Sequence, residues 1–261
     1  MIILENINDI DKSSRGRCIS IGNFDGIHQG HMQLIKNTIE IARKKNLIST
    51  ILTFDPMPEE FFDSKDFFRL MEMSDKYQIF DELGIDQVIP ILFNKDFSEV
   101  NKDDFVKDIL IHKLMLEHLI VGNDFQFGHK RQGDISLLKS YENQGLYCLT
   151  VLDLVKTSNS KVSSRDIRAL IKDGRIKDAN TMMAMPFSLS GKVIHGEKRG
   201  RELGYPTANI EICNSYRING IFLVSILFEH KKLFGLASWG DKPTFSGNFL
   251  LIISNFFFAD E

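Results

Sequence analysis

Residues 17–46 read "RCISIGNFDGIHQGHMQLIKNTIEIARKKN", and this stretch decides the fold of the first part of the chain. Its apolar start predicts a short buried strand, and the apolar residues between Met32 and Ile41 recur near the spacing of a helix. Basic residues close the helical stretch, which suits the negative end of a helix dipole. The stretch therefore predicts a strand, a glycine-rich turn and a helix in direct succession.

The same alternation continues along the chain. Further strand-like runs occupy residues 47–56, 86–93, 117–125 and 146–155, and helical patterns occupy residues 74–85, 101–115 and 134–145. In the first of these helices, Ser74 is the predicted N-cap and Gly84 the predicted stop. Strands that alternate with helices at this spacing predict an α/β fold with a doubly wound parallel sheet.

Three polar turns follow strands of the predicted sheet. They are "GNFD" at residues 22–25, "TFDP" at residues 53–56 and "VGNDF" at residues 121–125. In doubly wound sheets, ligands bind beyond the carboxyl ends of the strands, where the strand order reverses. We therefore expect the three turns to converge on one crevice.

The pattern changes after Pro186. Strand-like runs joined by turns replace the helical periodicity, as in "IFLVSILF" at residues 221–228. The sequence thus predicts two domains, one over residues 1–185 and a smaller, mostly β domain over residues 186–261.

The composition is that of a soluble globular protein, with 43% hydrophobic and 26% charged residues. A net charge of −3 gives no reason to expect nucleic-acid binding, and the longest apolar runs are too short to cross a membrane. Cys18, Cys148 and Cys213 form no CxxC pair, which argues against a disulfide framework or zinc site and favours a reducing compartment. The first residues do not resemble a secretory signal, so the expected location is cytoplasmic. The sequence gives no indication of oligomeric state.

His28 and His31 share one face of the first turn of the predicted helix. Free backbone N–H groups and the positive end of the helix dipole point to the same place, which favours an anion. Two imidazoles can donate hydrogen bonds to phosphate there, and Gly22, Gly26 and Gly30 let a ligand approach the backbone. There are two alternatives. If the HxxH pair is considered in isolation, helix capping is favoured over a functional role by about three to one. A metal pair would need a third ligand.

Five motifs in order resemble those of the bifunctional riboflavin kinase/FMN adenylyltransferases, the prokaryotic FAD synthetases. They are the HxGH-type turn "GNFDGIHQGH" (22–31), "TFDPMPEEFF" (53–62), "LGIDQVIPILFNKDFSEVNKDDFVKDIL" (83–110), "VGNDFQFGHKRQGD" (121–134) and "VSSRDIR" (162–168). The resemblance implies an N-terminal nucleotidyltransferase domain that transfers AMP from ATP to FMN, giving FAD and pyrophosphate, with Mg²⁺ on the triphosphate. Since no covalent protein intermediate is needed, catalysis consists of positioning and charge stabilisation.

The same resemblance implies roles for individual residues. The implied catalytic residues are His28, His31 and Arg168. The implied ATP-binding residues are Gly22, Asn23, Phe24, Asp25, Gly30, Ser163 and Ser164. The implied flavin-binding residues are Phe54, Pro56, Asp124, Phe125 and Phe127. The alternatives are core packing for the last two phenylalanines, helix capping for Ser163 and a surface charge for Arg168.

One residue of these motifs departs from the family pattern. Arg165 stands where the family has a threonine after the two serines. A short hydroxyl donor is thereby replaced by a long cation, which attracts phosphate but cannot make the same short contact.

The segment "SGKVIHGEKRGRELGYPTANI" at residues 190–210 resembles the opening of a riboflavin kinase domain, which is a β-barrel. It implies that Thr207 ligates Mg²⁺ and that the nucleotide is held by Gly196, Gly200, Gly204 and Asn209. If the glycine-rich run is considered alone, a mobile basic loop is favoured over a phosphate-binding loop by about two to one. "GLASWGDKPTF" at residues 235–245 resembles a later segment of the same domain.

In that family a strand with the catalytic glutamate follows, whereas here no glutamate stands between Phe245 and Glu261. A general base must lie within reach of its proton, so we expect a truncated, incomplete barrel with impaired phosphorylation of riboflavin to FMN. We also expect such a barrel to expose a sheet edge, and the apolar tail to be an aggregation hazard if it is uncovered.

The expected partners are the small molecules ATP, FMN and riboflavin. Two other functions stay open at this point. One is a nucleotidyltransferase that acts on another phosphate acceptor, and the other is a non-catalytic protein that binds flavin or nucleotide without turnover.

Overall fold

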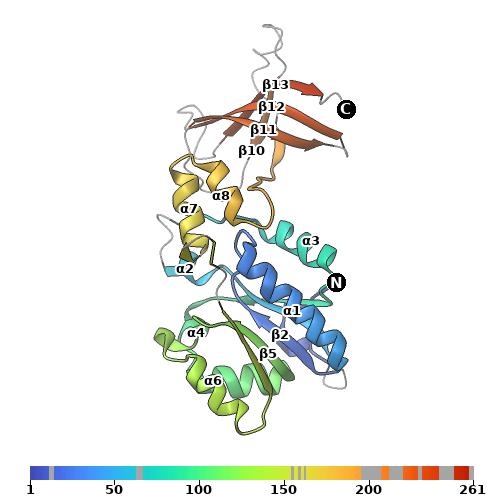
Figure 1. Ribbon diagram of the computed structural model, residues 1–261, viewed down its shortest axis with the longest axis vertical. Helices are drawn as coiled ribbons and strands as arrows, with labels where there is room; N and C mark the ends of the chain where they lie inside the picture. The colour runs from blue at the N-terminus through green and yellow to red at the C-terminus, as the bar shows by residue number, and fades with distance from the viewer. Residues whose placement is uncertain are drawn as a thin grey trace. The chain divides into compact units, whose positions relative to one another are not determined.

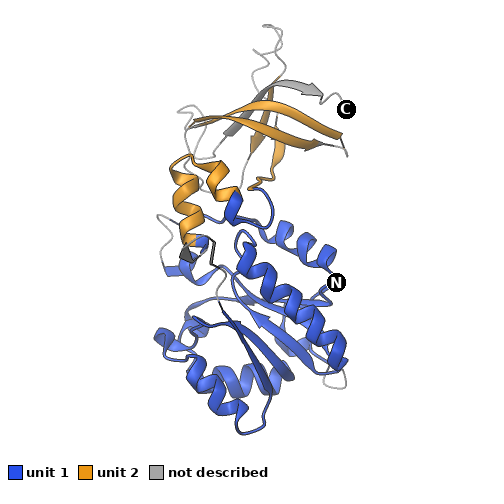
Figure 2. Cartoon of the chain, viewed as in Figure 1, with its two compact units in different colours: residues 1–164, 181–186 blue, residues 165–180, 187–261 orange. Residues whose placement is uncertain are grey.

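The computed structural model describes residues 1–11, 15–62, 67–153, 156–157, 160–161, 163–194, 207–211, 220–228, 231–240 and 250–258. The chain divides into two compact units, one of residues 1–164 and 181–186 and the other of residues 165–180 and 187–261 (Figure 2). The domain boundary between residues 185 and 186 stays a prediction.

The first unit is built on a six-stranded sheet in the order β1-β4-β3-β2-β5-β6, with every neighbouring pair parallel. Its strands are β1 (Ile2–Ile3), β2 (Arg17–Ile21), β3 (Ile48–Asp55), β4 (Gln87–Leu92), β5 (Leu116–Gly122) and β6 (Cys148–Leu152). The chain moves outward from β2 to β3 and β4 on one side, then continues with β5 and β6 on the other side. The predicted doubly wound parallel sheet is confirmed, and its order reverses between β2 and β5.

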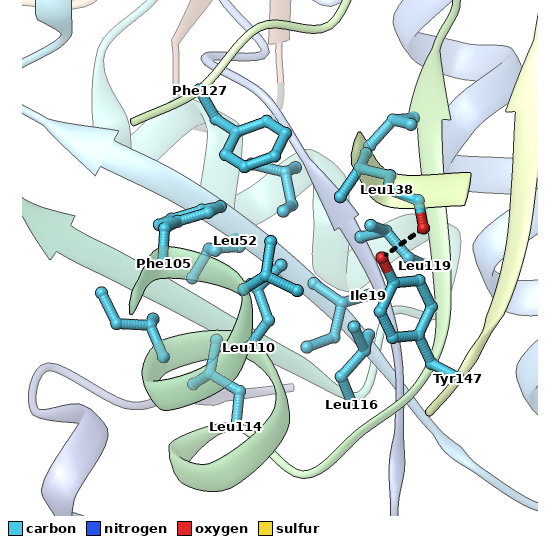
Figure 3. Packing of buried hydrophobic residues seen from close by; sticks show 14 of the residues in the cluster. Ile19, Leu52, Phe105, Leu110, Leu114, Leu116, Leu119, Phe127, Leu138 and Tyr147 are labelled. Atoms are coloured by element: carbon cyan, nitrogen blue, oxygen red, sulfur yellow. Dashed lines mark hydrogen bonds between the residues drawn. The ribbon is translucent and has the colours of Figure 1, made fainter. Parts of the chain in front are cut away.

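Helices cover both faces of this sheet (Figure 1). On one face, α1 (Gln29–Lys45) and α3 (Met73–Leu83) pack on Ile51 and Val88. On the other face, η2 (Phe105–Lys113) and α6 (Ile135–Glu142) pack on the next residues along the same strands, Leu52 and Ile89. Figure 3 shows Leu52 in this cluster. Because alternate residues of a strand face opposite sides, burial on both faces explains the continuous apolar runs of the sequence.

The other elements of this unit are short. They are η1 (Ile7–Asp9), α2 (Pro58–Phe62), α4 (Lys95–Ser98), α5 (Lys102–Asp104), η3 (His129–Arg131), β7 (Lys156–Thr157) and β8 (Ser160–Lys161). The helix predicted over residues 101–115 is α5 followed by η2, which is a π-helix.

The predicted ends of α3 have different outcomes. Gly84 ends the helix with a left-handed backbone at φ 88°, as predicted. Ser74 is not the N-cap, because the helix already includes Met73, whose side chain is buried. Glu72 occupies the cap position.

The second unit contains most of α7 (Ser164–Lys172) and α8 (Ile176–Met182) and an antiparallel sheet in the order β11-β12-β13-β10-β9. Its strands are β9 (Lys192–Ile194), β10 (Thr207–Glu211), β11 (Gly220–Phe228), β12 (Lys231–Gly240) and β13 (Leu250–Phe258). Among the described strands, β9 and β11 are the two edges, so the barrel is not closed. The tail strand β13 is not one of these edges, because its backbone pairs with both β10 and β12.

Gly128 tests how tightly the first unit is packed. Its φ is 73°, and a Cβ atom there would lie 2.7 Å from the Lys102 Cα. Left-handed strain and overlap with backbone both oppose a side chain, so Gly128→Ala is expected to lower the free energy of unfolding by about 3 kcal/mol. Gly145 is the control, because its φ is 75° but no atom lies within 4 Å of the added Cβ. Urea denaturation of both variants measures the difference, and equal losses would show that crowding at Gly128 contributes nothing.

Candidate functional site

The three polar turns follow β2, β3 and β5, which are neighbours in the sheet. Because these strands are parallel, their carboxyl ends lie at the same edge. The strand order reverses at this place, which is where ligands bind in doubly wound sheets. The topology therefore brings the three turns to one edge of the sheet, and their convergence on one crevice stays a prediction.

His28 is the N-cap residue of α1. Its Nδ1 accepts a hydrogen bond from the His31 backbone N–H at 3.3 Å, and the residue is only 9% exposed. An accepting Nδ1 carries no proton, so the proton of the neutral ring is assigned to Nε2. Helix capping, the alternative considered for this histidine, therefore occurs in the structure.

The His28 and His31 rings stack face to face, with centroids 3.6 Å apart and planes 15° from parallel. The lone pairs of imidazole nitrogens lie in the ring plane, so two parallel rings do not direct them at a common point. This geometry does not suit a metal pair, in which both nitrogens must point at one ion.

His31 Nδ1 is buried and, within the described residues, has no hydrogen-bond partner. Burial lowers the pKa of His31 well below its usual value, and the nearby His28 and Lys76 lower it further. The ring is therefore neutral near pH 7. A buried imidazole nitrogen without a partner, in the first turn of a long helix, can satisfy itself on an anionic oxygen.

The turn before α1 has an unusual backbone. Phe24 and Ile27 have positive φ values of 48° and 34°, on either side of Gly26 at 74°. Positive φ is costly for bulky and β-branched residues, so this turn stores strain. Gly30 then allows the histidines to stack, since a Cβ atom there would lie 3.2 Å from the His28 ring.

The side chains of this turn contact the protein itself. Phe24 is fully buried and packs on the His31 ring at 5.2 Å. The Asp25 carboxylate, 1% exposed, accepts backbone hydrogen bonds from Leu70 at 2.9 Å and Met71 at 3.2 Å. Asn23 Nδ2 donates to Glu59 at 2.7 Å. Their roles in ATP binding stay predictions, and the contacts indicate that they shape the turn.

Two other segments contact the same turn. The Ser164 hydroxyl donates to the Asp25 carbonyl oxygen at 2.9 Å, which joins the "VSSRDIR" motif to the HxGH-type turn. Met183 forms an isolated β-bridge with His28. The sequence offers no signal for the bridge, because Met183 lies in an apolar run without a recognisable motif.

Lys76 is a further residue that sequence reasoning missed. Its side chain is fully buried, and Nζ donates to the Asn23 carbonyl oxygen at 3.0 Å. Desolvation by burial lowers the pKa of Lys76, while Asp25, Asp55 and Glu72 raise it. In the sequence it stands in the polar run "SDK", which is typical of a solvated helix face.

The end of β3 carries an ion-pair network and an aromatic cluster. Arg69 bridges the Asp55 and Glu60 carboxylates at 2.6 and 2.8 Å. Beside it, five rings are in mutual contact and form what we call the aromatic cluster: Phe54, Phe61, Phe62, Phe93 and Phe97. Phe62 is 70% exposed, although aromatic side chains are usually buried. Phe54 and Pro56 are among the flavin-binding residues predicted from the sequence, whereas the two exposed rings of α2, Phe61 and Phe62, are not.

The turn after β5 contains the other flavin candidates. Asp124 is exposed, and Phe125 stacks on Phe127 with centroids 5.5 Å apart. Phe127 is only 6% exposed and belongs to the core cluster with Phe105, where Figure 3 shows both rings. In the structure, Phe127 is therefore a core residue. Its role in flavin binding stays a prediction.

The remaining candidates belong to α7 and to the second unit. Ser163 immediately precedes α7, while Arg165 is exposed and Arg168 half-buried on that helix. In β10, Thr207 is exposed and Asn209 half-buried. Gly196, Gly200 and Gly204 lie outside the described residues, and all of these assignments stay predictions.

Two features are absent from the described part of the chain. No group of three or more His, Cys, Asp or Glu side chains has the arrangement needed to hold a metal ion. No helix there is long and apolar enough to cross a membrane.

Comparison with known sequences gives two family matches. The family described as FAD synthetase matches residues 10–166, and the family described as riboflavin kinase matches residues 183–261. Two curated relatives carry the name bifunctional riboflavin kinase/FMN adenylyltransferase. The one from Buchnera aphidicola subsp. Schizaphis graminum is 38% identical over 94% of this chain and 80% of its own length. The one from Escherichia coli K12 is 32% identical over 95% of this chain and 80% of its own length.

Comparison with solved structures finds a crystal structure titled macrolide-efflux protein, from Streptococcus pneumoniae. It is 26% identical in sequence with a TM-score of 0.83, covering 100% of this chain and 85% of the other. The similarity therefore extends over both units.

Proposed function

The chain belongs to the family of bifunctional riboflavin kinase/FMN adenylyltransferases, and from this membership we propose that AMP transfer takes place at the turn bearing His28 and His31. The chain is an enzyme of flavin cofactor biosynthesis, which makes the other nucleotidyltransferase and the non-catalytic binder the less favoured alternatives. The observation that carries the placement is the buried His31 Nδ1 in the first turn of α1, which has no hydrogen-bond partner among the residues that the structure describes.

The reaction joins FMN to AMP. A phosphate oxygen of FMN attacks the α-phosphorus of ATP, and the bond from that phosphorus to the β-phosphate oxygen breaks to release pyrophosphate. Negative charge builds on the oxygens around the α-phosphorus, so fixed hydrogen-bond donors aimed at them lower the barrier. His31 would donate from Nδ1, and the N–H groups of the first turn of α1 would add their dipoles.

The phosphates need further donors, which α7 could supply. Ser164 already contacts the turn through the Asp25 carbonyl oxygen. Arg168 follows one helical turn later, so the two residues share a face of α7. We assign Ser163, Ser164 and Arg168 to the ATP phosphates on the strength of the family motif.

Mg²⁺ is proposed to accompany ATP as part of the substrate. Mg²⁺ retains several waters and is commonly held by nucleotide phosphates with one or two protein oxygens. In the second unit, the exposed Thr207 hydroxyl fits the role of one such oxygen for the kinase reaction. When bound, the ion supplies positive charge to the triphosphate.

The flavin ring is proposed to lie against the aromatic cluster. The exposed Phe62 packs edge-on with Phe61 and Phe93, at centroid distances of 5.1 and 5.9 Å. A planar, apolar heterocycle such as isoalloxazine stacks on rings of this kind. Its phosphate could then reach the neighbouring turn, because β3 and β2 end at the same edge of the sheet.

The direct test uses purified protein with FMN and Mg–ATP. FAD and pyrophosphate are expected in equal amounts, measured by chromatography and by a coupled pyrophosphate assay. Other phosphate monoesters replace FMN in parallel reactions. If one of them releases pyrophosphate as fast as FMN does, the enzyme acts on a different acceptor.

Phe62→Ala tests the flavin side of the site. Loss of ring stacking and apolar contact is expected to raise the KM for FMN about tenfold, with the KM for ATP unchanged. Leu146→Ala is the control, because Leu146 is also an exposed apolar side chain but lies before β6, at the opposite edge of the sheet. Steady-state kinetics measure both constants, and an equal rise in the KM for ATP would contradict the placement of the flavin.

We place the reaction in the cytoplasm, with small molecules as the partners. The free thiols of Cys18 and Cys148 are compatible with a reducing compartment. The net charge of −3 gives no support for a nucleic-acid partner.

A further inference from the structure

Lys76 of α3 is a buried cation surrounded by functional segments. Its side chain has 0% exposure, which is rare for lysine. Nζ donates to the Asn23 carbonyl oxygen at 3.0 Å and lies 3.9 Å from the Met57 sulfur. It therefore connects α3 to the first residue of the strained turn and to the residue after Pro56.

Charged groups from several segments act on Lys76. They are Asp25 in the turn, Asp55 at the end of β3, and Arg69 and Glu72 in the segment leading into α3. Burial lowers the pKa of Lys76, while three of these four groups are acidic and oppose that shift by favouring the ammonium form.

The strained turn needs support from its surroundings. Two non-glycine residues, Phe24 and Ile27, adopt positive φ, which is energetically costly for residues with a bulky side chain. Such a conformation persists only where surrounding contacts fix it. The hydrogen bonds that do so are those of Lys76 with Asn23, of Asp25 with Leu70 and Met71, and of Ser164 with Asp25.

We propose that Lys76 is a positioning residue for adenylyl transfer, which holds the turn at residues 23–27 in its strained conformation and places a buried positive charge near His31. The inference rests on the proposed function, because AMP transfer is the reaction it serves. Lys76 contacts no reacting atom in this scheme. It acts through the Asn23 carbonyl oxygen and through its charge.

The first test replaces the ammonium while keeping the length of the side chain. Lys76→Met is expected to lower the kcat for FAD formation at least 30-fold, with the KM for FMN within about threefold of the parent. Lys76→Arg retains the charge and is expected to restore at least a tenth of the parent kcat. Gln78→Met is the matched control on the exposed face of α3, and its kcat should not change.

The second test measures the electrostatic effect of Lys76 on His31 without catalytic turnover. His28 and Lys76 are the charged or titratable neighbours that lower the pKa of His31, beyond burial itself. Removing a nearby positive charge raises the pKa of a histidine. An NMR titration of His31 in the unliganded protein should therefore give a higher pKa in Lys76→Met, but not in Gln78→Met.

The outcomes separate this inference from the proposed function. If the parent protein forms no FAD, the proposed function fails, while the His31 titration still tests the link to Lys76. If the parent forms FAD but Lys76→Met keeps its kcat within threefold, the positioning role is wrong. If Lys76→Met does not fold, Lys76→Arg and Lys76→Gln decide: comparable kcat values for these two variants would also overturn the proposal.

Discussion

His31→Ala is expected to lower the kcat for FAD formation by about 10²–10³-fold, the usual cost of removing one preorganised donor from a transition state. His31 Nδ1 is buried, has no partner within the described residues and lies in the first turn of α1. Burial keeps the pKa of His31 well below its usual value, so the ring is neutral near pH 7. In the proposed reaction, His31 donates to a phosphate oxygen of ATP, and single-turnover kinetics with FMN and Mg–ATP measure the loss of that donor.

The control for this substitution is His112→Ala. The His112 side chain is 73% exposed in η2 and lies 3.6 Å from Asp108, a surface contact of little energetic weight. Its kcat should equal that of the parent. His31→Asn keeps a donor in the same place and should recover part of the rate. If His31→Ala stays within fivefold of the parent, the phosphates bind elsewhere.

The fold of the first unit could be predicted because its signals are local and repeated. Apolar strand runs alternate with helical periodicity, and parallel strands then force the turns after β2, β3 and β5 to one edge. The position of His31 at the start of α1 follows from the same local pattern. These features depend on spacing along the chain, which the sequence displays directly.

The rest of the site depends on contacts between distant residues. Lys76 and Asp25 are 51 positions apart. Neither "SDKYQIF" nor "GNFD" indicates that this lysine is buried and interacts with the charge of that aspartate. The N-cap of α3 was mispredicted for the same reason, because the burial of Met73 outweighed the preference of Ser74 for a cap. Tertiary burial decided both cases.

The aromatic cluster also depends on contacts between distant residues, here through the exposure of its rings. The sequence places Phe61 and Phe62 in a family motif, but the exposure of Phe62 depends on what α2 leaves uncovered. Phe127 has a similar motif context and lies in the core. An equal sequence signal thus corresponds to a surface ring in one case and a buried ring in the other.

Asp25→Ala is expected to lower the free energy of unfolding by about 3–5 kcal/mol, the usual cost of removing one partner from a buried ionic arrangement. The Asp25 carboxylate is 1% exposed, and its loss leaves the Leu70 and Met71 N–H groups without this acceptor. It also removes a negative charge that favours the ammonium form of the buried Lys76. Thermal and urea denaturation measure the loss. Glu40→Gln, which breaks an exposed pair with Lys44, should change stability by less than about 1 kcal/mol.

The double variant Asp25→Ala with Lys76→Met gives the sharper result. If the two side chains form one buried electrostatic unit, removing both should cost less than the sum of the single losses, because no uncompensated charge stays behind. A coupling of about 1–3 kcal/mol is expected from the double-mutant cycle. Purely additive losses would mean that Asp25 acts through the Leu70 and Met71 backbone alone. The strained turn would then be fixed from two independent sides, and restoring one contact could not compensate for the other.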